Sequence, residues 1–233
     1  MSQLTKKQFG LTGNQLKIIA LITMTVDHIG VYLFPQATLL RIIGRLAFPL
    51  FAYMIAQGCR YTRSRTRYLL TIAALGILCQ VVYWVTMGSL YQRVLITFIF
   101  SIALIYLLDY ARRRASVFWS LLTALALLLV WFLSEGLVQL LPHTDYAIDY
   151  GFCGILLPVL IYIAKDQTQA LLHTLIGLLI LCLVNGGLQW FCLAAIPLLA
   201  LYNGTRGKTK LKYLFYIYYP IHLVVLHLLR LWI

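Results

Sequence analysis

Charged residues are scarce in this sequence, and acidic residues are the scarcest of them. Only 11% of the 233 residues are Asp, Glu, Lys or Arg, against about 25% in soluble domains, while 62% are hydrophobic. So little polar surface cannot cover a globule in water, which excludes a water-soluble domain. With six carboxylates against 19 Lys and Arg, the formal net charge is +13. The sequence therefore predicts an integral membrane protein.

The sequence also lacks the patterns of disulfide frameworks and metal sites. Its five cysteines are scattered and include no C-x-x-C pair, so we expect neither a disulfide scaffold nor a bound metal. No His-Glu-x-x-His segment is present, which argues against intramembrane proteolysis by a zinc enzyme. The apolar stretches leave no polar segment that could form a separate soluble domain. We therefore expect one domain over residues 1–233.

Nine apolar stretches are candidate membrane helices. A helix needs about 20 apolar residues, at about 1.5 Å of rise each, to cross about 30 Å of hydrocarbon. The nine predicted spans are Leu16–Phe34, Leu39–Gln57, Tyr68–Met87, Val94–Tyr110, Val117–Leu141, Phe152–Ala164, Ala170–Val184, Leu188–Leu201 and Tyr213–Trp232. The sixth, seventh and eighth are short, which leaves open whether they are tilted, re-entrant or wrongly divided. The predicted fold class is an all-α polytopic membrane helix bundle.

Basic residues gather in alternate loops between these stretches. If nine helices alternate, one side holds Lys6, Lys7, Arg60, Arg63, Arg65, Arg67, Arg112, Arg113, Arg114, Lys165, Arg206, Lys208, Lys210 and Lys212. The other side keeps Arg93 and little else. By the positive-inside rule the N-terminus is predicted to be cytoplasmic. The positive charge thus indicates membrane topology, and we expect no nucleic-acid partner.

Ionisable side chains inside a bilayer cost about 2.5–3.5 kcal/mol each on insertion scales, so they mark candidate sites. Asp27 and His28 lie inside the first predicted span. Neighbours on a helix point about 100° apart, so each should face a different partner. Arg41 and Arg45 share one face at the start of the second span and are the natural partners. The alternative is a purely structural Asp–Arg pair, with His28 bonded to a carbonyl.

The last predicted span carries a second candidate cluster. Tyr216, Tyr219 and His222 recur at three-residue spacing and share a helix face, while Pro220 removes a backbone donor beside them. A histidine near mid-membrane beside a proline is costly unless it lines a wet cavity. We therefore expect His222 and Tyr219 to contribute to a site.

Two loops complete the set of candidates. The acidic segment 142–151 includes Asp145 and Tyr150, which could receive an amine-bearing substrate; a plain solvated loop is the alternative. The basic, glycine-containing segment 202–208 includes Asn203, Arg206 and Lys208, which suit a phosphate-binding loop. Positive-inside bias explains the same basic residues without a ligand.

Three segments together resemble the TraX family, membrane proteins associated with acetylation of the N-terminus of conjugative pilin. They are Leu16-Lys17-Ile18-Ile19-Ala20 leading through Met24 to Asp27-His28, then Gly44-Arg45-Leu46-Ala47-Phe48-Pro49-Leu50-Phe51, and Tyr219-Pro220-Ile221-His222-Leu223. More remotely, the chain is similar to transmembrane acyltransferases, including the acyltransferase-3 group and the lysosomal heparan glucosaminide acetyltransferase. In these a membrane-buried histidine serves acyl transfer from acetyl-CoA.

The resemblance implies an acetyl-CoA-dependent acetyltransferase in the inner membrane of a bacterium. His28 is expected to act as base or acyl carrier, with Asp27 orienting the site and His222 and Tyr219 completing it. Arg41 and Arg45 would stabilise an oxyanion or hold a substrate anion. The segment from Asn203 to Lys208 would hold the coenzyme A phosphates, and the acceptor would be a peptide or glycan. The alternatives are a proton-coupled transporter or flippase, and a non-catalytic factor of conjugation or secretion assembly.

Overall fold

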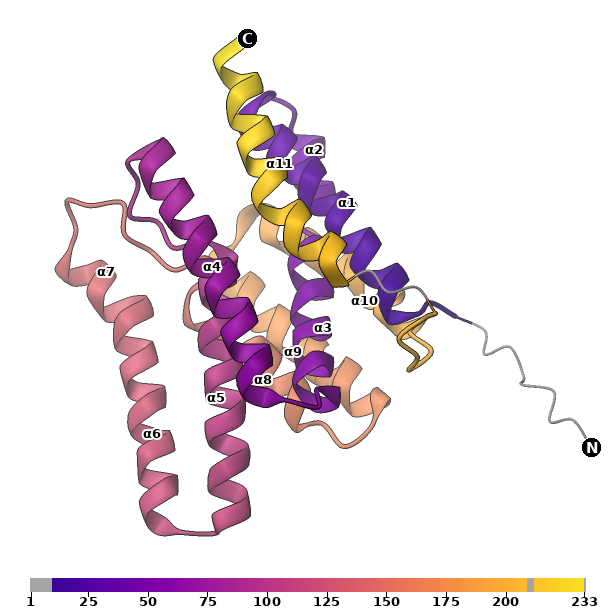
Figure 1. Cartoon of the computed structure of the whole chain (residues 1–233), viewed down its shortest axis with the longest axis vertical. Coiled ribbons are helices and arrows are strands. Elements are labelled where there is room, and N and C mark those ends of the chain that lie inside the picture. Colours follow the sequence, from indigo (N-terminus) through magenta and orange to yellow (C-terminus); the bar gives the residue numbers. More distant parts are fainter. Residues whose placement is uncertain (1–9, 209–211, 233) are drawn as a thin grey trace, which may run out of the picture. The chain divides into compact units, whose positions relative to one another are not determined.

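Helices make up the named secondary structure of the described residues, 10–208 and 212–232, in this computed structural model; side chains at 212–216 and 231 are not described. In chain order the elements in Figure 1 are α1 (Gly13–Tyr32), α2 (Thr38–Gly44), α3 (Ala47–Tyr61), α4 (Arg65–Met87), α5 (Val94–Arg114), α6 (Val117–Trp131), the π-helical turn η1 (Phe132–Gly136), α7 (Leu137–Leu140), α8 (Gly151–Ile163), α9 (Gln167–Asn185), the 3-10 helix η2 (Gly187–Ala194), α10 (Ala195–Ala200) and α11 (Lys212–Trp232). The predicted all-α class is confirmed for this part of the chain.

Five helical stretches of the described residues are long and apolar enough to cross a membrane. They are Thr38–Tyr61, Arg65–Met87, Val94–Arg114, Val117–Leu140 and Gln167–Asn185. Three shorter apolar helices are Gly151–Ile163, Gly187–Ala200 and Ile217–Arg230. Helix α1 is in neither group, and its sequence includes Lys17, Asp27 and His28. These helices are consistent with a multi-pass membrane protein, and the count of nine spans stays a prediction.

The chain divides into two compact units. Unit 1 joins the two ends of the chain, Met1–Phe51 and Phe191–Ile233, and unit 2 is the segment between them, Ala52–Trp190. Because unit 1 needs both ends, the units are not successive segments of sequence. The expectation of a single domain stays a prediction.

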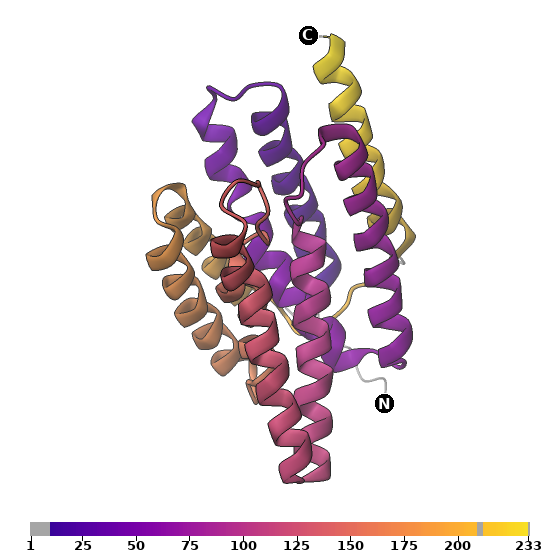
Figure 2. The same cartoon turned by 90° about the vertical axis from the view of Figure 1, so that its left-hand side faces the viewer.

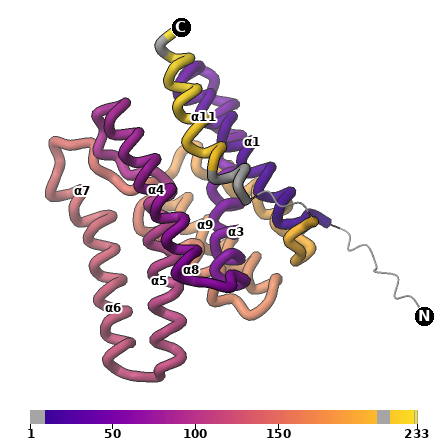
Figure 3. Tube along the Cα trace, in the orientation of Figure 1, coloured from indigo at the N-terminus to yellow at the C-terminus, as the bar shows by residue number. Residues whose placement is uncertain are grey.

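In unit 1, α1 packs against α2 on one side and α11 on another. The tube in Figure 3 shows α1 and α11 running side by side, although they lie at opposite ends of the sequence. Thr12 caps α1, with its hydroxyl accepting from Gln15 N and the Gln15 side chain returning to Thr12 N. This reciprocal cap fixes the start of α1 at the point where the loop before α11 meets it.

Unit 2 is built around α5, which packs against α4, α6 and α8, while α9 packs against α8. Figure 2 shows α5 and α6 as a long hairpin. At one end of this unit, Arg60 donates to the carbonyl of Tyr162 in the last turn of α8 at 2.9 Å and to that of Ala164, the residue after α8, at 2.7 Å. Arg65, at the start of α4, pairs there with Asp109 of α5. Cations at helix C-termini satisfy carbonyls that have no helical donor.

The loops at the other end of unit 2 carry carboxylates. Gln92 N donates to Ala147 O at 2.7 Å, and Asp149 N donates to Gln92 O at 2.9 Å. The Tyr91 hydroxyl donates to Asp149 Oδ1 at 2.7 Å. Burial, with the Asp149 carboxylate adding to it, raises the pKa of Tyr91, so the phenol remains the donor. The acidic segment 142–151 is thus tied to the α4–α5 loop.

Candidate active site

A triad of charged side chains joins α1 to α2. Arg41 Nη1 donates to Asp27 Oδ2 at 2.8 Å, and Arg45 Nη2 donates to Asp27 Oδ1 at 3.2 Å. The side chains of Asp27 and Arg45 are only 17% and 15% exposed, and that of Arg41 is 28% exposed. The structure therefore places both arginines on Asp27, as their spacing predicted. Their role toward a substrate stays a prediction.

Two glycines let the helices approach this closely. A Cβ at Gly44 would overlap the carboxylate of Asp27, and a Cβ at Gly30 would lie 2.9 Å from the Cβ of Leu40. Neither glycine has a positive φ, so space and not backbone conformation requires them. Gly44 is thus part of the geometry that holds the triad.

His28 pairs with a histidine from the other end of the chain. His28 Nδ1 and His222 Nε2 lie 2.8 Å apart, and the two rings are nearly parallel, with 11° between planes and 5.1 Å between centroids. Both side chains are buried. The structure thus brings the two histidines predicted as catalytic into direct contact.

Helix α11 continues through Pro220 without a break, so the proline removes one N–H but does not end the helix. Tyr219 lies edge-on to His222, with 5.4 Å between ring centroids and 81° between planes. The side chain of Tyr216, predicted on the same face, lies outside the described residues. Tyr219 therefore borders the histidine pair, as its spacing predicted.

The loop before α11 is bound to the start of α1. Gly13 N donates to Thr205 O at 2.7 Å, and Asn14 N donates to Arg206 O at 3.0 Å. First-turn amides of a helix otherwise have no partner and can bind anions. Here loop carbonyls occupy two of them. An anion beside the start of α1 would therefore be bound mainly by side chains and not by these two main-chain amides.

Asn203 shapes this loop. Its Oδ1 accepts from Thr205 N at 3.0 Å and from the Thr205 hydroxyl at 2.7 Å, while its Nδ2 donates to Gly10 O at 3.4 Å. Arg206 and Lys208 are exposed. Lys210, predicted beside them, lies outside the described residues. Asn203 thus holds the loop, and the role of Arg206 and Lys208 toward a phosphate stays a prediction.

Asp145 and Tyr150 lie in unit 2. Leu90 N donates to Asp145 Oδ1 at 2.9 Å. The Ser89 hydroxyl and this amide hold the pKa of Asp145 below its ordinary value. Tyr150 has a left-handed backbone, φ 63°, directly before α8, which is unusual for an aromatic residue. Asp145 thus anchors a turn, and the role of both residues toward an acceptor stays a prediction.

A sequence profile of the TraX protein family matches residues 12–230, which is nearly the whole chain. The chain belongs to the TraX family. The match includes both helices of the histidine pair and the loop between residues 202 and 208.

This TraX chain is similar to two bacterial proteins. It is 31% identical over 153 residues to the uncharacterized protein RP591 of Rickettsia prowazekii (strain Madrid E), covering 65% of this chain and 55% of that protein. It is 26% identical over 237 residues to the probable fimbrial assembly protein FimC, serogroup H1, of Dichelobacter nodosus, covering 91% of this chain and 93% of that protein. The chain thus spans about half of the first relative. The search of solved structures found no match.

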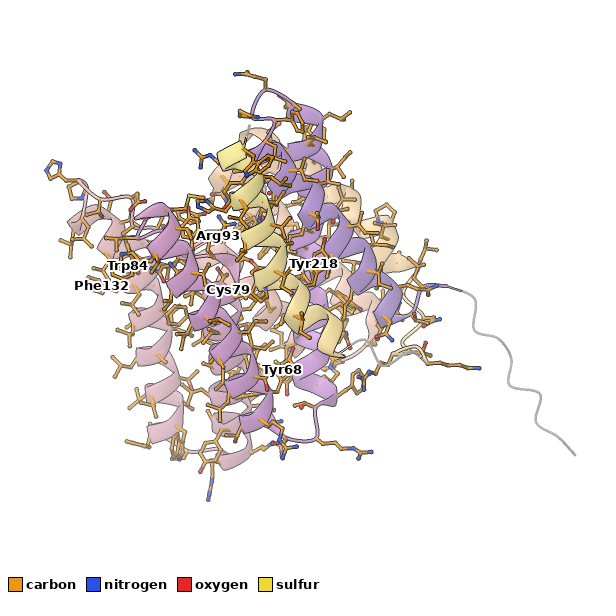
Figure 4. All side chains as sticks on the ribbon, turned by 45° about the horizontal axis from the view of Figure 1, so that its top comes forward. Tyr68, Cys79, Trp84, Arg93, Phe132 and Tyr218 are labelled. Atoms are coloured by element: carbon orange, nitrogen blue, oxygen red, sulfur yellow. The ribbon has the colours of Figure 1, made fainter. Side chains whose placement is uncertain are left out.

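Sequence reasoning missed one member of the histidine cluster of this TraX protein. The ring of Tyr218 stacks on that of His222, with 5.2 Å between centroids and 13° between planes. Its hydroxyl lies 2.7 Å from the Thr25 hydroxyl on α1. Figure 4 labels Tyr218 on α11, on the side toward α1. Residues four apart share a helix face, so the spacing from His222 could have identified it.

Sequence reasoning also missed two carboxylates inside predicted spans. Asp109 pairs with Arg65 and Arg113. Glu135 lies in the π-helical turn η1, and its Oε1 accepts from Phe152 N at 2.8 Å, at the start of α8. Each is an acidic residue within an apolar stretch, and this pattern could have identified both as candidates. Both serve helix ends in unit 2.

Proposed function

We propose that this TraX protein is a membrane-embedded acetyltransferase that moves an acetyl group from cytosolic acetyl-CoA to an amine or hydroxyl acceptor. The acceptor is a peptide N-terminus, such as that of a pilin, or a glycan. The observation that carries the proposal is the buried pair of His28 and His222. Imidazole has an ordinary pKa of about 6.5, which suits a general base near neutral pH.

The reaction needs one proton acceptor at the reacting centre. His28 takes the proton of the acceptor N–H or O–H as that atom attacks the acetyl carbonyl carbon. The C–S bond then breaks, the acetyl group stays on the acceptor, and the coenzyme A thiolate recovers the proton from the imidazolium. In the two-step variant His28 itself attacks the thioester, and the C–S bond breaks to release the coenzyme A thiolate. The acceptor then takes the acetyl group from His28, and the acceptor's proton goes to the thiolate. Both routes use the same basic nitrogen.

The Asp27 triad carries positive charge at the residue next to His28 in the sequence. Two guanidiniums share one carboxylate, so the triad has a net charge of +1. A fixed positive charge stabilises the oxyanion that forms when the thioester carbonyl is attacked, or holds an anionic group of a substrate. Asp27 acts through Arg41 and Arg45 by keeping them in place. Tyr219 contributes an aromatic wall beside His222.

The basic loop is the proposed site of the coenzyme A phosphates. The sequence of unit 1 has one carboxylate, Asp27, against ten basic residues: Lys6, Lys7, Lys17, Arg41, Arg45, Arg206, Lys208, Lys210, Lys212 and Arg230. Lys17 lies close enough to Arg206 to interact with it electrostatically. From Asn14, bonded to this loop, to His28 is 14 residues, or about 21 Å along α1. The long pantetheine arm would cover that distance.

The proposed topology has nine spans, a cytoplasmic N-terminus and a location in the bacterial inner membrane. It requires the 202–208 loop and the start of α1 to lie on one side, and their main-chain hydrogen bonds are consistent with this. It also requires the ends of α3, α5 and α8 and the start of α4 to lie together. The contacts of Arg60 with Ala164 and of Arg65 with Asp109 support that arrangement.

A non-catalytic assembly role is the second candidate. The name of the Dichelobacter nodosus relative, a probable fimbrial assembly protein, favours it. An assembly factor has no need of His28 as a base. His28→Ala would then leave pilus or fimbrial assembly intact in the host.

The test uses purified protein in proteoliposomes with radiolabelled acetyl-CoA and either a peptide amine or an amino sugar as acceptor. We expect wild type to cleave the thioester and label the acceptor, and His28→Ala to be at least about 100-fold slower. His143→Ala, which removes an exposed histidine in a loop, is the matched control. Absence of turnover together with absence of acetyl-CoA binding, measured as a thermal shift, would reject the enzyme. Proton-coupled transport and assembly would then be tested.

A further inference from the structure

Three nearly parallel aromatic rings from α1 and α11 form one group, called the stack below. The ring of Tyr218 stacks on that of His222, and the rings of His222 and His28 meet edge to edge through their 2.8 Å hydrogen bond, with 13° and 11° between successive planes. Two of these rings belong to α11, four residues apart on one face. The stack therefore holds the histidine pair in a single orientation relative to α1.

The hydrogen bonds of the stack have a defined direction. His222 Nδ1 lies 3.0 Å from the main-chain oxygen of Tyr218, and a carbonyl can only accept, so His222 Nδ1 carries the proton. In neutral His222, Nε2 is then the acceptor. His28 Nδ1, 2.8 Å from that Nε2, must therefore donate. In the neutral pair the basic nitrogen of His28 is its Nε2.

The hydroxyl of Tyr218 fixes the stack to α1. The Thr25 hydroxyl donates to Leu21 O at 2.8 Å, so in the 2.7 Å bond between Thr25 and Tyr218 the tyrosine is the donor. Tyr218 thus contributes its carbonyl to His222, its ring to the stack and its hydroxyl to α1. It is the residue that connects the orientation of His222 to the helix that carries His28.

We infer that Tyr218 and His222 are positioning residues that hold His28 as the Nδ1–H tautomer, so that Nε2 is the nitrogen that takes the proton or the acetyl group. The catalytic part of this inference rests on the proposed function, and the tautomer itself does not. When Nε2 gains a proton, the Nδ1–H bond to His222 remains, so the imidazolium keeps its partner and its orientation.

The tautomer is measured by solid-state NMR on protein with 15N-labelled histidine in lipid bilayers, well above the ordinary imidazole pKa of about 6.5. We expect His28 and His222 to have protonated Nδ1 and unprotonated Nε2. His173 is an internal reference, because its Nδ1 lies 2.8 Å from Leu160 O and must also donate. His28→Gln and His222→Gln assign the signals. A neutral His28 with its proton on Nε2 would overturn the inference.

Turnover then separates positioning from mere stability. We expect His222→Ala to lower kcat on the order of 100-fold with an unchanged KM for acetyl-CoA, because a wrong tautomer removes the base without removing substrate binding. His222→Gln should recover much of that loss, since its amide oxygen can accept from His28 Nδ1. Equal kcat for the Ala and Gln variants would contradict the positioning role.

The Tyr218 hydroxyl is tested by a double-mutant cycle. Tyr218→Phe and Thr25→Val each remove the same hydrogen bond, so each should lower kcat by about 3- to 10-fold and the double variant no further. Thr23→Val is the matched control, because the Thr23 hydroxyl bonds carbonyls of its own helix α1, those of Ile19 at 3.0 Å and Ala20 at 3.1 Å. Additive losses would refute the coupling.

The proposed function and the inference about the tautomer can be rejected separately. Wild-type protein with the expected tautomers but no acetyl-CoA turnover would reject the proposed function and leave the positioned imidazole in place. Turnover that requires His28, with the proton of neutral His28 found on Nε2, would reject the inference and leave the acetyltransferase in place.

Discussion

Removal of the Asp27 carboxylate should destabilise unit 1 more than removal of either arginine that it binds. Asp27 is the single carboxylate in the sequence of this unit, and both Arg41 and Arg45 bond to it. In Asp27→Ala, two largely buried guanidiniums would face each other without an anion. Loss of one partner from a buried ion pair costs about 3–5 kcal/mol. We expect Asp27→Ala to lower the free energy of unfolding by an amount in that range.

The arginine variants should rank by burial. Arg41 is more exposed than Arg45, and Arg41→Ala leaves the ion pair of Arg45 with Asp27 intact. We therefore expect Arg41→Ala to lower the free energy of unfolding by about 1 kcal/mol. Arg45→Ala should cost more, and Asp27→Asn, which keeps an acceptor but loses the charge, should lie between Arg41→Ala and Asp27→Ala. At about 2–4 °C per kcal/mol for a chain of this size, Asp27→Ala should lower the apparent Tm by about 6–20 °C.

The assay is thermal unfolding of purified protein in one detergent at one scan rate, since membrane proteins rarely unfold reversibly. The decisive control replaces Asp27 by Leu and both Arg41 and Arg45 by Met. Apolar replacement of a whole buried ion cluster is often neutral, so this triple variant should recover most of the lost Tm. A triple variant as unstable as Asp27→Ala would show that an unpaired charge is not the cause.

Three further predictions concern other parts of the chain. Gly44→Ala should cost about 1–3 kcal/mol in thermal unfolding, because its Cβ would displace the Asp27 carboxylate; an unchanged Tm would contradict the close approach. Because the pKa of Asp145 is lowered, its carboxylate accepts from Leu90 N at neutral pH and stabilises the loop, and this hydrogen bond weakens as the pH falls below 3.8, the ordinary pKa of Asp. Hydrogen-exchange protection of the Leu90 amide should therefore fall below that pH. Asp145→Asn should abolish this pH dependence. Lys208→Gln should raise the KM for acetyl-CoA several-fold with little change in kcat; an unchanged KM would remove the phosphate site.

The sequence was sufficient to predict the Asp27 triad, because it depends on local geometry. A helix fixes which faces Asp27 and His28 present, and the short turn before α2 returns the chain beside the end of α1. The spacing of Arg41 and Arg45 then leaves one common face toward Asp27. Neighbouring helices with a short connection have few possible registers, and this is why the pairing could be derived.

The histidine pair was predicted as a set of candidates and not as a contact. His28 and His222 are 194 positions apart, and no local spacing relates them. The cost of burying each one singled them out, but the hydrogen bond between them depends on how α11 packs on α1. Tyr218 was missed for the same reason, since its role comes from an interhelical bond to Thr25.

The π-helical turn η1 shows a further limit of local patterns. Its extra residue shifts Leu137 N onto Phe132 O, so the carbonyl of Leu133 loses its usual helical donor, and the Tyr146 hydroxyl bonds to it at 2.9 Å. The sequence of Val117–Leu141 predicts one helical span, and nothing in it shows that a tyrosine from a later loop supplies the missing hydrogen bond.

The two polar clusters of unit 1 differ in what stability alone explains. Asp27 neutralises Arg41 and Arg45, so the triad has a structural reason to exist whether or not the protein is an enzyme. When neutral, the pair of His28 and His222 balances no charge, and two apolar side chains of similar volume would pack there without polar atoms to satisfy. A functional explanation therefore rests on the histidines. If it is correct, Asp27→Asn protein that remains folded should keep a substantial fraction of wild-type kcat, while equally stable His28→Ala protein should keep almost none. Equal kcat in the two folded variants would contradict the assignment of the chemistry to the imidazole pair.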